Sequence, residues 1–132
     1  MIKNNFLLTC DVDWASEEVL KVFCEDIIEK NIRPLFFCTH SSKILDHFYE
    51  KNLVDIGIHP NFKKNSSHGS NIKDVINNIY NLFPDSKISR SHGFIDSVQI
   101  QNELFKKKIL FDSNKLEYHK VNIKKEKLNS GI

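Results

Sequence analysis

Short apolar runs alternate with longer stretches in which apolar residues recur every three or four positions, and this alternation continues from residue 6 to residue 111. A short apolar run is typical of a buried strand, and the three-to-four spacing is typical of one buried helical face. Pro34 and Pro84 each follow a helical stretch and prevent its continuation. The pattern predicts strands over residues 6–10, 35–39, 53–58, 87–91 and 108–111, and helices over residues 16–31, 44–48, 72–83 and 98–107.

Strands and helices that alternate with short connections predict an α/β fold around a parallel sheet. Successive right-handed crossovers can close such a sheet into a barrel or leave it open, and the pattern does not choose between the two. A chain of 132 residues with 40% apolar content can bury one core. We therefore expect one α/β domain over residues 1–112. Residues 113–132 are rich in Lys and Asn and predict a polar tail or a truncated continuation.

Charge and hydropathy exclude two classes of partner. The net charge is +2, and basic residues are scattered among acidic ones, so no nucleic-acid-binding face is expected. No apolar window is long enough for a membrane span, and the chain does not start with a signal-peptide pattern, which predicts a cytoplasmic protein. The three cysteines, Cys10, Cys24 and Cys38, lie in apolar stretches and are predicted to be buried free thiols.

Residues that bind metals or oxyanions follow four of the predicted strands. In chain order these residues are Asp11 and Asp13, His40, His59, and Arg90 with His92. Because the carboxyl ends of parallel strands meet at one edge of a sheet, we expect these side chains to lie close together. Carboxylate oxygen and imidazole nitrogen together suit zinc and similar divalent ions. The sequence therefore predicts a divalent-metal site at this edge.

Each of these residues also has a plainer interpretation. Asp11 and Asp13 could cap the helix that follows them. His59, His40 and His92 could each be loop histidines held by hydrogen bonds. The other three histidines lie on a helix, in a polar loop and in the tail, and are predicted to be solvated: His47, His68 and His119.

Four short segments resemble the motifs of the polysaccharide deacetylases, carbohydrate esterases that share the fold of the nodulation-factor deacetylases, and especially their branch in surface-polysaccharide and O-antigen biosynthesis. The segments are, in family order, residues 8–14 (LTCDVDW), 33–40 (RPLFFCTH), 55–62 (DIGIHPNF) and 89–93 (SRSHG). The resemblance implies a partial (β/α) barrel of deacetylase type. It also implies that Asp11 is the catalytic base, that Asp13 and His59 bind a metal, expected to be zinc, and that Arg90 orients Asp11.

The sequence departs from the family pattern in two respects. The family usually places a second histidine ligand four residues after the first, and this position is Lys63. We expect His92 to supply the third ligand, with His40 as the alternative, because both follow strand ends. The resemblance covers about residues 6–112, roughly the first half of a family domain. The chain therefore looks truncated or split, and self-association or a complementing chain is expected.

The resulting hypothesis is a metal-dependent deacetylase that hydrolyses the N-acetyl group of a sugar in surface-polysaccharide biosynthesis, with an N-acetylated carbohydrate as substrate. One alternative is a truncated, non-catalytic remnant or one half of a split enzyme. Another is a metal-dependent hydrolase of a different amide or of a phosphate ester, because the residues alone do not identify the bond.

Overall fold

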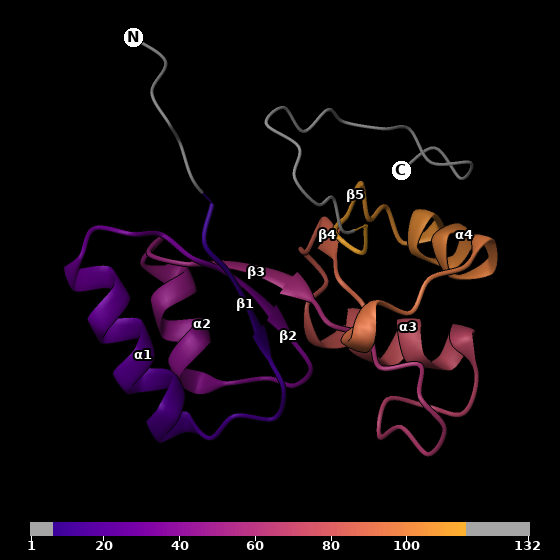
Figure 1. Cartoon of the computed structure of the whole chain (residues 1–132), viewed down its shortest axis with the longest axis horizontal. Helices are drawn as coiled ribbons and strands as arrows, with labels where there is room; N and C mark the ends of the chain where they lie inside the picture. Colours follow the sequence, from indigo (N-terminus) through magenta and orange to yellow (C-terminus); the bar gives the residue numbers. More distant parts are fainter. Residues whose placement is uncertain (1–6, 116–132) are drawn as a thin grey trace, which may run out of the picture.

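The computed structural model of the chain describes residues 7–115 and follows the predicted alternation of strands and helices (Figure 1). The elements are β1 Thr9–Val12, α1 Glu17–Glu29, β2 Leu35–Cys38, α2 Lys43–Glu50, β3 Asp55–Ile58, α3 Ile72–Leu82, β4 Ile88–Ser89, the 3₁₀ turn η1 His92–Phe94, α4 Val98–Lys106 and β5 Phe111–Asp112. Each α-helix begins after a residue whose side chain accepts a hydrogen bond from a backbone N–H of the first turn. These N-caps are Ser16, Ser42, Asn71 and Ser97.

The first strand begins and ends later than the apolar run predicted. The run indicated residues 6–10, whereas β1 pairs with β2 over residues 9–12, from Thr9 opposite Leu35 to Val12 opposite Cys38. The bounds of β1 are set by its pairing with the fully buried β2. The apolar run alone carries no information about this pairing. As a result Asp11 lies inside the strand and Asp13 is the first residue after it.

The five strands form one parallel sheet in the order β1-β2-β3-β4-β5. Each crossover leads to the neighbouring strand, as in a segment of a (β/α) barrel. The guanidinium of Arg90, the first residue after β4, donates a hydrogen bond of 2.9 Å to Asp11 on β1. In a flat sheet three strand spacings would separate these strands by about 14 Å. The sheet therefore curves, and Arg90 and Asp11 lie on its concave face.

The helices cover the convex face of the sheet, where the hydrophobic core lies. Figure 1 shows α1 and α2 together beside β1 to β3, and α3 below α4 beside β4 and β5; each of these helix pairs is in contact. The core combines alternate strand residues with one face of each helix, and includes Leu20, Cys24, Phe36, Cys38, Leu45, Ile58, Ile76, Ile79, Ile100 and Leu104. The α/β class and the parallel sheet predicted from the sequence are confirmed.

A glycine on the concave face leaves room for a neighbouring aromatic ring. Gly57 lies opposite Phe37 in the register of β2 and β3. A Cβ atom at Gly57 would lie 2.8 Å from the Phe37 ring and 3.0 Å from Ile88. The missing side chain therefore leaves room for the Phe37 ring, which packs beneath the Arg90 guanidinium at 4.3 Å from the ring centroid.

The cysteines are free thiols, as predicted: Cys24 and Cys38 are buried and Cys10 is partly buried. Burial raises the pKa of Cys24 to about 11 and that of Cys38 to about 12, so neither is a reactive thiolate near neutral pH. Within residues 7–115, no helix is long and apolar enough to cross a membrane. Most of the predicted tail, from residue 116 onward, lies outside the described residues.

Candidate metal centre

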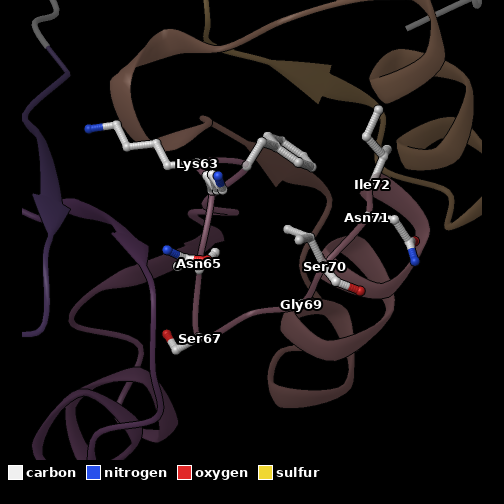
Figure 2. A pocket seen from close by; sticks show the side chains of 11 residues that line it. Lys63, Asn65, Ser67, Gly69, Ser70, Asn71 and Ile72 are labelled. Carbon is white, nitrogen blue, oxygen red and sulfur yellow. The ribbon is translucent and has the colours of Figure 1, made fainter.

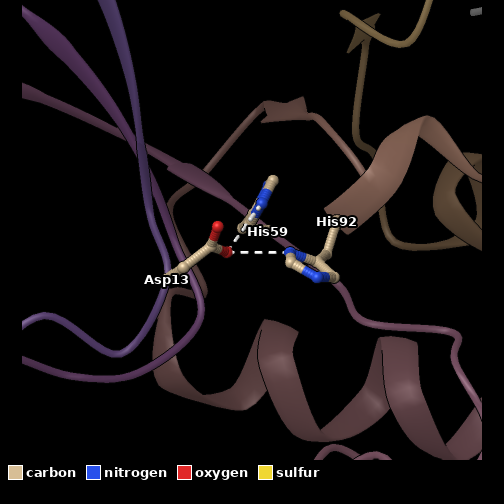
Figure 3. Close-up of side chains that lie close together, drawn as sticks. All are labelled: Asp13, His59 and His92. Atoms are coloured by element: carbon tan, nitrogen blue, oxygen red, sulfur yellow. Dashed lines mark hydrogen bonds and ion pairs between the residues drawn. The ribbon is translucent and has the colours of Figure 1, made fainter.

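Three of the predicted residues come together at the carboxyl ends of the strands. Asp13 follows β1, His59 follows β3 and His92 lies in the turn after β4. One possible ligand atom from each lies within 4.8 Å of the other two. The Asp13 Oδ1 atom is 2.8 Å from His92 Nδ1 and 3.4 Å from His59 Nε2. Figure 3 shows the carboxylate of Asp13 facing both imidazole rings.

His59 is fixed by the backbone of the neighbouring strand. Its ring is fully buried, and its Nδ1 lies 2.5 Å from the carbonyl oxygen of Arg90. A carbonyl oxygen only accepts, so Nδ1 carries the proton and Nε2 presents its lone pair toward Asp13. Burial is the main cause that lowers the pKa of His59, which favours the neutral imidazole. A neutral, oriented imidazole is the form that ligates a metal.

Arg90 links the cluster to Asp11. Its Nη1 donates to Asp11 Oδ1 at 2.9 Å and to Thr9 Oγ1 at 3.1 Å, both on β1. Its Nη2 donates to Ser113 Oγ at 2.9 Å. Arg90 therefore positions two residues of the site. Its backbone carbonyl holds His59, and its guanidinium holds Asp11.

The sequence interpretation missed two residues that support this arrangement, Ser113 and Asn114. Both follow β5 directly, whereas the predicted site residues follow only the first four strands. Ser113 accepts from Arg90, and Asn114 Oδ1 accepts from the backbone N–H of Ser91 at 2.8 Å. Asn114 Nδ2 also donates to the Ser91 hydroxyl at 3.3 Å. Their position at the end of β5 was the signal that could have identified them.

Lys63 stands at the position of the absent family histidine and contacts the cluster. Its Nζ lies 3.2 Å from His92 Nε2. The ammonium donates to Nε2, so in this arrangement His92 Nδ1 carries a proton and donates it to Asp13. Lys63 thus fixes the tautomer of His92 from the side opposite Asp13.

Two other histidines lie outside the cluster. His40, the alternative third ligand, uses both ring nitrogens elsewhere: Nδ1 is 3.0 Å from the Thr39 hydroxyl and Nε2 is 3.1 Å from the Ala15 carbonyl. The prediction that His68 is solvated was wrong. Its ring is buried, with Nδ1 accepting from the Asn61 N–H at 3.0 Å and Nε2 donating to the Thr39 carbonyl at 2.8 Å. His68 therefore ties the loop after β3 to the end of β2.

A cavity of about 560 Å³ opens in the loop between β3 and α3, beside Lys63 (Figure 2). Most of the residues that line it carry a hydroxyl, amide or ammonium group, and the others include the Phe62 ring. The residues are Phe62, Lys63, Lys64, Asn65, Ser66, Ser67, Gly69, Ser70, Asn71, Ile72 and Val75. Because Lys63 also contacts His92, the cavity and the cluster share a residue.

Comparison with known proteins agrees with this fold. The family model described as WbmS-like polysaccharide deacetylase matches residues 8–131, and the chain belongs to this family. A crystal structure of WbmS from Bordetella bronchiseptica, a protein assigned to the polysaccharide deacetylases and to O-antigen biosynthesis, is similar with 27% identity and a TM-score of 0.75. The match covers 82% of this chain and 46% of WbmS, so the chain spans about half the length of that protein. Comparison with the curated proteins gives no match.

Proposed function

We propose that this chain carries the metal site and the base of a deacetylase that hydrolyses the N-acetyl group of a sugar in surface-polysaccharide biosynthesis. The observation that carries the proposal is the cluster of Asp13, His59 and His92 beside the Arg90–Asp11 pair. Membership of the WbmS-like polysaccharide deacetylase family supports a carbohydrate substrate.

The donor set fits a divalent cation, with zinc as the first choice. One carboxylate and two imidazoles are the ligands of many catalytic zinc sites, which keep a further position for water or substrate. The Nε2 lone pair of His59 already faces Asp13, and the Asp13 side chain is about half exposed, so an ion has a route to the cluster. An ion bound by these three residues, with the proton on His92 Nδ1 released, would supply Lewis-acid chemistry toward the acetamide carbonyl and the attacking water.

The residues around the cluster have separate tasks in this reaction. Arg90 holds Asp11 Oδ1, while Asp11 Oδ2 accepts no hydrogen bond from the described residues and is free to take a proton from the water. The oxygen of that water bonds to the acetyl carbon, the C–N bond breaks as the nitrogen takes up the proton that Asp11 accepted, and acetate and an amino sugar leave. Thr9 and Ser113 hold the Arg90 side chain from opposite directions, so Asp11 is aimed by a fixed partner.

Metal analysis of the purified chain tests the proposal. Wild-type protein, an Asp13→Asn variant and an Asp85→Asn control are prepared identically, since Asp85 is an exposed carboxylate in the turn that precedes β4, whereas the cluster lies where the strands end. We expect near-stoichiometric zinc in the wild type and the control and little in Asp13→Asn. Metal-loaded protein is then assayed for acetate release from N-acetylated sugars. Equal metal content and activity in Asp13→Asn would overturn the proposal.

A second candidate is a deacetylase-like domain that works only with a complementing chain or a second copy. In favour of it, β1 and β5 each pair with one strand only among residues 7–115, so both edges of the sheet are open there. Sedimentation or light scattering distinguishes the two. A monomer that releases acetate would exclude the second candidate, whereas activity confined to an oligomer or a two-chain mixture would favour it.

A further inference from the structure

Trp14 lies beside the cluster of Asp13, His59 and His92, and its exposed side chain has no role in the proposed hydrolysis. The residue is 46% exposed, and it follows Asp13 directly in the chain. We propose that Trp14 is a substrate-positioning residue on which the apolar face of the acetylated sugar stacks. This inference rests on the proposed function, because it names the surface that holds the substrate of the same site.

The backbone holds Trp14 in a conformation that a bulky residue rarely adopts. Its φ is 55°, in the left-handed region, where the Cβ atom crowds the following carbonyl oxygen. The backbone N–H of Trp14 donates to the Thr39 hydroxyl at 3.2 Å, and that hydroxyl donates to the Val12 carbonyl at 2.9 Å. The chain therefore turns sharply after Asp13 and is fixed to the end of β2. Such conformations persist where surrounding contacts impose them, and they concentrate at functional sites.

The ring contacts place the indole at the rim of the cluster. Trp14 meets the ring of His92, one of the three clustered residues, edge-on, with the ring centroids 5.7 Å apart. On another side it is tilted against His68, at 6.0 Å between centroids. His68 is itself fixed at both ring nitrogens by the ends of β2 and β3. The indole is therefore supported by two rings and still about half open to solvent.

The chemistry of this position fits a pyranose ring. A sugar presents C–H groups on one face and hydroxyls at its rim, and an exposed indole offers a large apolar surface at little conformational entropy. An aromatic residue that served only the hydrophobic core would be buried within it. Trp14 is not part of the core, which lies on the convex face of the sheet. A sugar ring stacked on Trp14 would have its acetamide near His92 and Asp13, and its hydroxyls could reach the cavity that Lys63 also lines.

Intrinsic fluorescence tests the inference directly, because Trp14 is the one tryptophan of the whole sequence. The wild-type chain is titrated with N-acetylglucosamine, N-acetylgalactosamine and triacetylchitotriose at millimolar concentrations, once after chelation and once with zinc added. We expect at least one sugar to shift or quench the emission in a saturable way. The absence of any saturable change with all three sugars in both forms would overturn the inference.

Two variants and a control separate stacking from folding. Trp14→Gly suits a left-handed backbone, so it should fold at least as well as the wild type. We expect calorimetric titration to show sugar affinity about tenfold weaker in Trp14→Gly, the upper range for an aromatic contact, and partly restored in Trp14→Phe. Phe105→Ala removes an aromatic side chain of the same exposure, 47%, from the last turn of α4, and should leave affinity unchanged. Wild-type affinity in Trp14→Gly would contradict the proposed role.

The measurement also separates this inference from the proposed function. Fluorescence reports sugar binding whether or not acetate is released. Saturable binding at Trp14 without metal or turnover would support the inference and reject the deacetylase reaction. Metal binding and acetate release that are indifferent to Trp14→Gly, in both KM and kcat, would reject the inference and keep the reaction.

Discussion

The convex face of the sheet and the edge where its strands end are built from opposite kinds of residue. On the convex face Phe36, Ile58 and Ile79 are fully buried and touch other apolar side chains. At the carboxyl edge His59 and Ser91 are buried and polar, and each of the two has a hydrogen-bonding partner from another strand end. The first region needs only apolar volume in the correct period, whereas the second needs particular atoms at particular distances. Changes in the two regions should therefore have different consequences.

The largest effect is expected for Asp11→Asn. Loss of a general base should lower the rate of acetate release by about 100- to 10,000-fold. Metal content should remain that of the wild type, because Asp11 pairs with Arg90 and is not one of the three clustered residues. Kinetics and metal analysis on one preparation check this, with Asp85→Asn as control. Loss of metal together with rate would place Asp11 among the ligands and contradict the division of roles.

A core substitution should show the opposite pattern. Phe36 is 1% exposed, packs edge-on against Phe23 with centroids 6.0 Å apart, and belongs to the convex core. Phe36→Ala should lower the free energy of unfolding in urea by about 3–5 kcal/mol. The milder Phe36→Leu should stay folded and retain both metal and sugar binding. If Phe36→Leu loses metal while remaining folded, the two regions are coupled and the comparison fails.

The same division explains what could be predicted from the sequence. The alternation of strands and helices followed from apolar periodicity, because burial of one face is a local property of each segment. The grouping of Asp13, His59 and His92 followed from the rule that parallel strands end at one edge. What failed depended on contacts between distant segments: the start of β1, which pairing with β2 sets, and the burial of His68, which Thr39 and Asn61 impose.

A smaller effect is expected at Asp112, a polar residue of the edge whose burial opposes stability. Burial, with Asp96 as a second cause, raises the pKa of Asp112 from 3.8 to about 6. A raised pKa means that the folded state binds the proton more tightly. Protonation of Asp112 therefore adds to the free energy of unfolding below about pH 4, and this contribution is lost as the pH rises through 6.

Asp112→Asn should therefore stabilise the chain at neutral pH and not in acid. We expect about 1–2 kcal/mol at pH 7, less than the full shift because the side chain is partly exposed, and little difference at pH 4. Asn keeps the oxygen that accepts from the Asn114 side chain. Urea unfolding at the two pH values checks this prediction. An equal gain at both values would mean that desolvation of the carboxylate is not the cause.

The smallest effect is expected at Lys63, whose ammonium lies 3.2 Å from His92 Nε2. A divalent cation at the cluster repels this charge, and the ammonium also favours the His92 tautomer whose Nδ1 carries a proton. In Lys63→Gln the amide oxygen can accept from Nε2–H instead, which leaves the Nδ1 lone pair for a metal. Zinc affinity, measured by competition with a chelating dye, should rise about tenfold, or roughly 1.4 kcal/mol. Lys64→Gln removes the same charge from the next residue along the loop and should change affinity less, since Lys64 lines the cavity and is not among the residues that contact His92. Weaker zinc binding in Lys63→Gln would contradict this prediction. It would mean that Lys63 holds His92 in the position from which it binds the metal, and that Lys63 is part of the site.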